Sequence, residues 1–140
     1  MTTHAQTAQA IRKELKAKFP TITFSVRSSS YAGGDSVRID YRNGVPSKDV
    51  YAIVNKYQEG HFNGMEDIYE YSNDRNDIPQ VKYVLVQRDI DNDIIEATRL
   101  DIAKRFGIVN IDDNQEWGKI FNDYSARSSQ VYRELADKTL

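Results

Sequence analysis

The sequence predicts an α+β domain: a four-stranded, mainly antiparallel sheet in αββαββ order with helices packed on it, followed by two further helices. Three observations lead to this prediction. Short stretches that alternate apolar and polar residues indicate strands, and longer stretches with apolar residues at helical spacing indicate helices. Gly or Pro residues separate these stretches, and 140 residues are enough to build one core.

The first helix is expected over residues 4–18, with Thr3 and Gln6 as a capping box and Pro20 as its stop. Its apolar side consists of Ala8, Ile11, Leu15 and Phe19. Two strands follow, TITFSVRS and SVRIDYR, which place Ile22, Phe24, Val26, Val37, Ile39 and Tyr41 on the side that faces the helix. Gly33 and Gly34 lie in the connection, so we expect a hairpin.

A second helix should begin at Ser47, run to about Gln58 and stop at Gly60. Phe62–Met65 then form a turn, and the next strand, DIYEY, places Tyr69 and Tyr71 on one face. The following strand, VKYVLV from Val81 to Val86, is apolar on both sides, which is typical of a strand in the interior of a sheet.

The third helix is expected from residue 91 to about 106, with Gly107 ending it. A second capping box, Asp113 with Glu116, precedes a fourth helix whose apolar stripe continues from Trp117 through Leu135. No Pro-rich linker separates these helices from the sheet. We therefore expect a single domain over residues 1–140, with an αββαββ core at 6–88 and an acidic helical extension at 89–140.

The composition excludes several kinds of site. There is no cysteine, so disulfides, thiolate zinc sites and cysteine nucleophiles are absent. The N-terminal stretch lacks an apolar signal region and no run approaches the length of a membrane span, so we expect a cytoplasmic protein with no membrane partner.

The formal charge of −2 hides an uneven distribution. Residues 1–60 carry nine Lys or Arg and five Asp or Glu, whereas residues 61–140 carry ten and sixteen. One interpretation is a surface with a basic side and an acidic side, and the alternative is ordinary solvated charge.

Several segments carry a family resemblance: the helix that enters FSVRSS, the turn before VRIDY, and FNGMED ahead of an aromatic strand. From about Gln6 to Arg88 the sequence resembles one of the large polyvalent protein-associated domains, the twenty-ninth of that series. Such domains occur in polyvalent proteins of phages and conjugative elements, which carry factors that protect incoming DNA from host defences. The resemblance implies a mobile-element protein in the cytoplasm of a bacterial host, and it assigns no functional residues.

Catalytic and metal-binding patterns are weak. His4 and His61 are the only histidines and lie far apart in the sequence. The pairs Asp91–Asp93 and Asp112–Asp113 could hold a divalent cation, but each lies where a helix begins, and helix capping explains acidic residues there. We expect no metal, no cofactor and no enzymatic activity, with a magnesium-dependent nuclease as the least favoured alternative.

Carboxylates of the C-terminal half provide the main candidate for partner binding. Spaced carboxylates on a helix and its flanking loops can imitate the phosphates of nucleic acid and attract a basic protein. Helix capping and solubilising charge are the alternative explanation. The residues predicted to contact a partner are Asp91, Asp93, Glu96, Asp112, Asp113 and Glu116, with Tyr69 and Tyr71 as aromatic anchors.

The first hairpin provides a different candidate, because Arg27, Arg38 and Arg42 should project from one face of the sheet beside Tyr31. Such a face can contact a phosphate backbone and stack a base. Solvated strand arginines are the alternative. The negative net charge of the chain weighs against nucleic-acid binding.

The leading hypothesis is a non-catalytic mobile-element protein that inhibits a host defence system, such as a CRISPR effector or a restriction enzyme. It would act by binding a defence protein or nucleoprotein complex directly, with nucleic-acid mimicry as one route. The alternative is a nucleic-acid-binding accessory module that uses the basic hairpin face. The sequence leaves the identity of the partner and the oligomeric state open.

Overall fold

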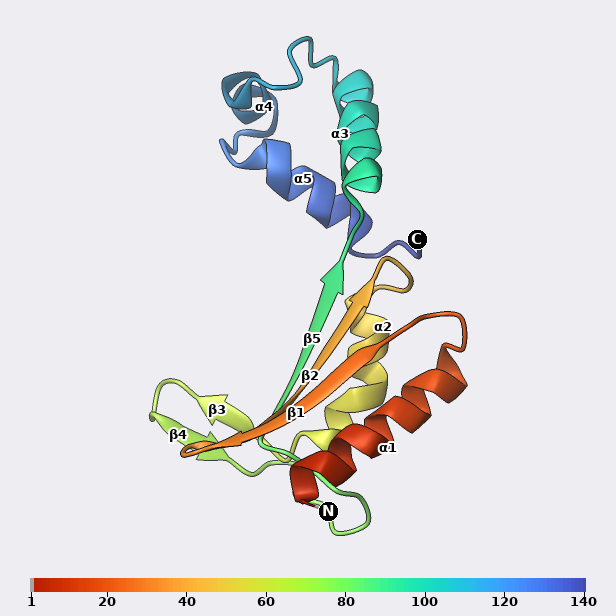
Figure 1. Cartoon of the computed structure of the whole chain (residues 1–140). Coiled ribbons are helices and arrows are strands. Elements are labelled where there is room, and N and C mark those ends of the chain that lie inside the picture. Colours follow the sequence, from red (N-terminus) through yellow and green to blue (C-terminus); the bar gives the residue numbers. More distant parts are fainter. Residues whose placement is uncertain (1) are drawn as a thin grey trace. The chain divides into compact units, whose positions relative to one another are not determined.

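The computed structural model describes residues 2–140, and it divides the chain into two compact units (Figure 1). The sheet unit ends at Asp89, and the helical unit runs from Ile90 to Leu140. The described residues contain five α-helices, a mixed three-stranded sheet and a two-stranded sheet, which confirms the predicted α+β class. Among them, no helix combines the length and the apolar character needed to cross a membrane.

The elements of the sheet unit are α1 (Thr3–Lys18), β1 (Ser25–Tyr31), β2 (Gly34–Arg42), α2 (Ser47–Val54), the 3₁₀ helix η1 (Asn55–Tyr57), β3 (His61–Asn63), β4 (Ile68–Glu70) and β5 (Tyr83–Asp89). The helical unit contains α3 (Asn92–Phe106), α4 (Asn114–Phe121) and α5 (Ala126–Leu135).

The sheet differs from the prediction in strand number and in pairing. Its order is β1-β2-β5, with β1 antiparallel and β5 parallel to β2, so the predicted four-stranded antiparallel sheet is wrong. The connection from β2 to β5 passes through α2 and returns the chain to the end of the sheet at which β2 begins. The two strands therefore run parallel. β3 and β4 pair only with each other, as a separate antiparallel ribbon.

β5 is an edge strand, so the prediction that residues 81–86 lie inside the sheet is also wrong. Side chains occupy its outer edge instead of another strand. The amide of Val84 donates to Oε1 of Gln58 at 2.8 Å, and the amide of Val86 donates to the hydroxyl of Tyr51 at 3.1 Å. These bonds satisfy backbone groups that an open edge would leave unpaired.

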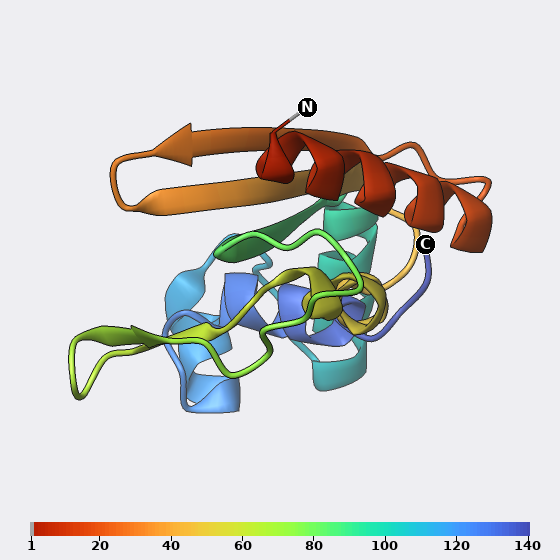
Figure 2. The ribbon, with the colours of Figure 1, turned by 90° about the horizontal axis from the view of Figure 1, so that it is seen from below.

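α1 and α2 cover the same face of the three-stranded sheet, because residues of both helices join one buried cluster with the inward side chains of all three strands. Figure 2 shows α1 lying along the β1–β2 hairpin, whose tip extends beyond the helix. The N-cap of α1 is Thr2, one residue before the predicted Thr3, and Pro20 follows the helix as predicted. The buried residues of the cluster are Ala8, Ile11, Leu15, Val26, Val37, Ile39, Tyr41, Val50, Val54, Tyr57, Val81 and Val84.

Two predicted helices are shorter than expected. α2 ends at Val54 and continues only as η1, so Gly60 does not cap it. The long C-terminal helix is divided into α4 and α5, because Asn122 adopts a left-handed conformation with φ of 52°. In contrast, α3 ends at Gly107 with φ of 72°, as the sequence predicts.

Candidate binding surfaces

The face of the three-stranded sheet opposite α1 and α2 is exposed. It carries every second side chain of each strand, because successive side chains point to opposite faces. β1 contributes Arg27 and Tyr31, β2 contributes Arg38 and Arg42, and β5 contributes Tyr83, Leu85 and Gln87. Arg27 lies directly opposite Arg38 across β1 and β2, and Arg38 lies next to Leu85 across β2 and β5. A basic half and an apolar half therefore meet on this face.

The β3–β4 ribbon extends the apolar half, because its tyrosines reach the start of β5. The ring of Tyr69 lies edge-on to Tyr83, with centroids 5.5 Å apart, and to Tyr71, with centroids 4.9 Å apart. The hydroxyl of Tyr69 donates to the carbonyl of Lys82 at 2.5 Å, and Nζ of Lys82 lies 4.9 Å from the Tyr69 ring centroid. Tyr69 is thus held, while Tyr71 stays 60% exposed.

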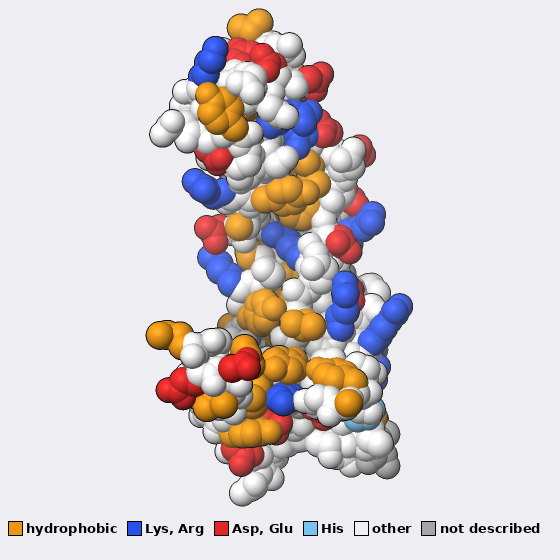
Figure 3. Space-filling view, turned by 90° about the vertical axis from the view of Figure 1, so that its left-hand side faces the viewer, with side chains coloured by type: hydrophobic (Ala, Val, Ile, Leu, Met, Phe, Trp, Pro, Cys, Tyr) orange, Lys and Arg blue, Asp and Glu red, His pale blue; other side chains and the backbone are white. Residues whose placement is uncertain are grey.

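We define the hydrophobic surface as Phe62, Tyr69, Tyr71, Tyr83 and Leu85. Phe62 is 51% exposed and pairs with Tyr69 across the ribbon, and Leu85 is 52% exposed two residues after Tyr83. Figure 3 shows hydrophobic side chains gathered over this part of the sheet unit. Exposed aromatic groups that are rigid and adjacent are typical of protein-binding sites.

Gly60 and the side-chain amide of Gln80 fix the ribbon to the rest of the sheet unit. Gly60 lies so close to the backbone of Glu70 that a Cβ atom would overlap its carbonyl oxygen. Behind the ribbon, the buried side-chain amide of Gln80 donates to the carbonyls of Lys56 (2.7 Å) and Asn73 (2.8 Å). These contacts support the ribbon that carries Tyr69 and the exposed Tyr71.

Burial also affects the chemistry of Tyr69. Desolvation raises the pKa of its phenol to about 12, and the negative charge of Glu59 adds to this shift. The phenol therefore keeps its proton further into the alkaline range than an exposed tyrosine, and it donates this proton to the carbonyl of Lys82.

The structure brings Arg27 and Arg38 together, whereas Arg42 lies further along β2, and carboxylates accompany Arg38 and Arg42. Nε of Arg38 forms an ion pair with Asp40 at 3.0 Å, and this partner raises the pKa of the guanidinium. Arg42 lies opposite Asp89 in the register of β2 and β5. Tyr31 is half-exposed at the end of β1 and donates to the carbonyl of Asp35. Among the described residues, Arg27 has no ion-pair partner.

The predicted acidic residues are mostly engaged within the helical unit. Glu96 pairs with the buried Arg99, and Asp112 pairs with Arg127 at 3.1 Å. Asp113 caps α4 by accepting a bond from the amide of Gln115 at 3.0 Å, as predicted. The carboxylate of Glu116 accepts from the amides of Val109 (2.7 Å) and Asn110 (2.8 Å) rather than from the cap residue.

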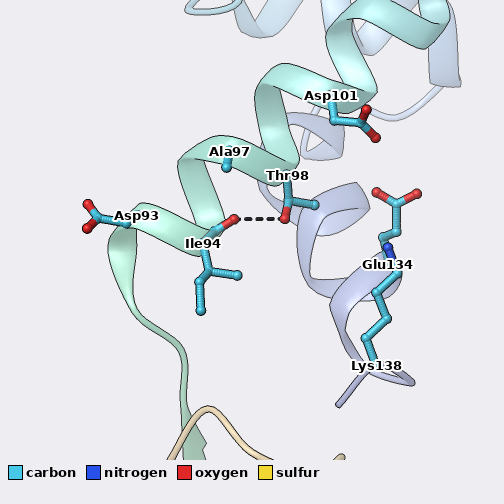
Figure 4. Close-up of a pocket in the computed structure, with 7 residues that line it drawn as sticks. All are labelled: Asp93, Ile94, Ala97, Thr98, Asp101, Glu134 and Lys138. Atoms are coloured by element: carbon cyan, nitrogen blue, oxygen red, sulfur yellow. Dashed lines mark hydrogen bonds between the residues drawn. The ribbon is translucent and has the colours of Figure 1, made fainter. Parts of the chain in front are cut away.

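Two predicted acidic residues lie near the start of α3. Asp91 is its N-cap residue, and its carbonyl accepts the amides of Ile94 and Ile95. Asp93 is exposed and lines a groove of about 400 Å³ between α3 and α5 (Figure 4). Two further residues that line the groove, Asp101 and Glu134, both form ion pairs with Arg105. Across residues 2–140, no group of three or more His, Asp or Glu side chains is placed to hold a metal ion.

Some surface residues were missed in the sequence. The sequence pattern places Phe62 in a turn and places Tyr83 and Leu85 in a strand, without assigning any of them to a binding surface. The alternation of β5 puts Tyr83 and Leu85 on the same side of the strand, so this part of the surface could have been predicted. The pairing of Arg38 with Asp40, two residues apart on one strand face, could also have been predicted.

Together these features define a small α+β domain that presents hydrophobic and charged surfaces, followed by a three-helix unit. The family model for large polyvalent protein associated domain 29 matches residues 2–101. The chain belongs to this family, which confirms the resemblance and supports a protein associated with phages or other mobile elements. The match covers the sheet unit and continues into α3, beyond the expected end near Arg88. No curated protein and no solved structure matches the chain.

Proposed function

We propose that this chain is a non-catalytic mobile-element protein that inhibits a host defence protein by direct binding, and that the hydrophobic surface makes the contact. The observation that carries this proposal is the exposure of Phe62 and Tyr71 beside the partly buried rings of Tyr69 and Tyr83, which hold each other by edge-on packing. The family supplies the setting, since it associates the chain with mobile elements.

The composition of the hydrophobic surface fits a protein partner. Tyr71 and Phe62 combine large contact area with few rotatable bonds, so their burial costs little conformational entropy. The sheet unit carries twelve Lys or Arg and eleven Asp or Glu, so its net charge is small. Binding through this surface would therefore depend on apolar contact more than on long-range attraction.

Nucleic-acid mimicry by the helical unit has less support. Glu96 and Asp112 are already paired with arginines, and Asp113 and Glu116 are bound to backbone amides. A carboxylate with an internal partner contributes less to the external field than a free one. The helical unit carries ten Asp or Glu and seven Lys or Arg, an excess of three acidic residues. This is half of the excess of six in residues 61–140.

The test compares the purified wild-type chain with a variant that carries Phe62→Ser and Tyr71→Ser. Both side chains are more than half exposed, so the variant should keep the wild-type circular dichroism spectrum. The wild-type chain should retain a defence protein from lysate of a host that the element enters and should reduce immunity in a challenge assay, and the variant should do neither.

The matched control is Met65→Ser, because Met65 is 99% exposed in the same ribbon but outside the hydrophobic surface. This variant should behave like the wild type. Retention of the same protein by the Phe62/Tyr71 variant would show that another surface binds, and full immunity with the wild-type chain would refute inhibition.

The second candidate is nucleic-acid binding by the basic half of the exposed sheet face. It is favoured by one observation, the position of Arg27 directly opposite Arg38, with Tyr31 further along the same exposed face of β1. The wild-type chain should then bind a labelled single-stranded oligonucleotide in an anisotropy titration, more weakly at higher salt, and Arg27→Ala should reduce the affinity. Absence of binding at low salt would eliminate this candidate.

A further inference from the structure

A pocket of about 300 Å³ lies beside α1 in the sheet unit, away from the hydrophobic surface. Its lining comes from α1 and from the segment that connects α1 to β1: Arg12, Lys16, Pro20, Ile22, Thr23 and Phe24. This volume is at the lower end of the range for small-molecule sites in proteins. The pocket therefore has room for a compact ligand.

One side of the pocket is apolar and is fixed by packing. Ile22 and Phe24 are partly buried against the main core of the sheet unit. The ring of Phe24 packs between Phe19 and Tyr41, with centroid distances of 6.1 Å and 5.2 Å. Because both of its neighbours hold it, Phe24 offers a preformed apolar wall.

The other side carries two positive charges. Arg12 and Lys16 are four residues apart on α1 and so lie on the same side of the helix. Nη2 of Arg12 donates to the carbonyl of Val26 at 2.5 Å, which anchors the guanidinium and leaves its other N–H groups for a ligand. Among the described residues, no carboxylate forms an ion pair with Arg12 or Lys16.

Glu14, the only acidic residue of α1, is turned away from the pocket. Its two carboxylate oxygens accept bonds from Lys56 and from the hydroxyl of Tyr57. Lysines in the last turn of a helix also stabilise the helix dipole, but Arg12 lies six residues before the end of α1 and is directed to β1 instead. The helix dipole therefore does not explain why an arginine occupies position 12.

We propose that this pocket binds a small molecule in which an anionic group, phosphate or carboxylate, is attached to a flat apolar group. The guanidinium of Arg12 and the ammonium of Lys16 would bind the anion, since a planar guanidinium matches the oxygens of phosphate and carboxylate. The apolar group would lie against Phe24, Ile22 and Pro20. This site is independent of the hydrophobic surface and of the function proposed for it.

The test uses four probes with the full chain in ¹H–¹⁵N NMR titrations: phenyl phosphate, benzoate, inorganic phosphate and benzyl alcohol. Phenyl phosphate or benzoate should cause saturable shifts of amides in residues 12–24, and whichever binds more tightly identifies the preferred anion. Inorganic phosphate has no ring and benzyl alcohol has no charge, so each should bind about tenfold more weakly or not at all.

Arg12→Ala and Lys16→Ala should each weaken binding by about tenfold. Two variants are used because Arg12 also bonds to β1, whereas Lys16 has an exposed side chain and leaves the fold intact. Lys13→Ala is the matched control, since Lys13 is an exposed lysine of the same helix that does not line the pocket. The proposal is overturned if neither aromatic anion saturates, if inorganic phosphate binds equally well, or if Lys13→Ala weakens binding as much as Lys16→Ala.

Discussion

The hydroxyl of Tyr57 donates a hydrogen bond of 2.9 Å to the carboxylate of Glu14, which lies on a helix 43 residues earlier in the chain. The second oxygen of the same carboxylate accepts a bond of 2.8 Å from Nζ of Lys56. Glu14 thus connects α1 to η1, the segment that leads from α2 to the β3–β4 ribbon.

Tyr57→Phe should lower the free energy of unfolding by about 1–2 kcal/mol, because it removes a hydrogen bond to a charged group at a buried position. The midpoint of urea unfolding, followed by circular dichroism, measures this effect. Tyr132→Phe is the control, since Tyr132 is half-exposed and should leave the midpoint unchanged. Equal midpoints for the two variants would show that the bond adds nothing to stability.

Stability should fall steeply in alkali. Burial raises the pKa of Tyr41 and Tyr57 to about 12, from an ordinary value of 10.0, and Glu14 adds to the shift at Tyr57. The folded chain therefore keeps these protons where the unfolded chain loses them. Their contribution is complete below pH 10 and is lost as the pH rises through about 12.

Thermal unfolding measured at several pH values, together with tyrosinate absorbance, tests this dependence. The melting temperature should decrease from pH 10 upward, and Tyr57→Phe should show a weaker decrease. A melting temperature that stays constant while the absorbance of tyrosinate rises would contradict the assignment.

Gly60→Ala should displace the ribbon, because the added methyl group overlaps the carbonyl of Glu70. We expect a loss of about 1–3 kcal/mol and weaker binding of the partner, since Tyr69 and Tyr71 would move. Gly64→Ala is a matched control in the same ribbon, where an added Cβ meets no atom within 4 Å. If both variants bind the partner like the wild type, the ribbon does not position the binding site.

Trp117→Ala should destabilise the helical unit by about 3–5 kcal/mol, since this fully buried indole packs against Phe121 and donates to the carbonyl of Ile111 at 2.9 Å. Hydrogen exchange read by mass spectrometry should show lost protection in residues 90–140. Val109→Ala, at a position 93% exposed, should have no such effect. Unchanged protection in the Trp117 variant would contradict the role of the indole.

Local patterns in the sequence were reliable guides to local structure. The apolar spacing of Ile11 and Leu15 predicted α1, alternation around Val37 and Ile39 predicted β2, and Gly107 marked the end of α3. These features depend on neighbours within a few residues, which the sequence displays directly.

Strand pairing depends on residues far apart in the chain, and the predictions about strand pairing were wrong. Apolar residues on both sides of β5 suggested burial on both sides, whereas one side faces the core and the other exposes Leu85 beside Tyr83. Likewise, the pairing of Asp112 with Arg127 joins different elements of the helical unit. A count of charges along the chain could not show that such carboxylates are neutralised.

The parallel pairing of β2 with β5 has a consequence for synthesis on the ribosome. A nascent chain that ends before residue 81 lacks Val81 and Val84, so it holds α1, α2 and the first hairpin with their apolar sides incompletely covered. The hairpin can form early, but the sheet closes only when β5 has left the exit tunnel. Until then, this incompletely folded intermediate exposes apolar surface that chaperones can recognise.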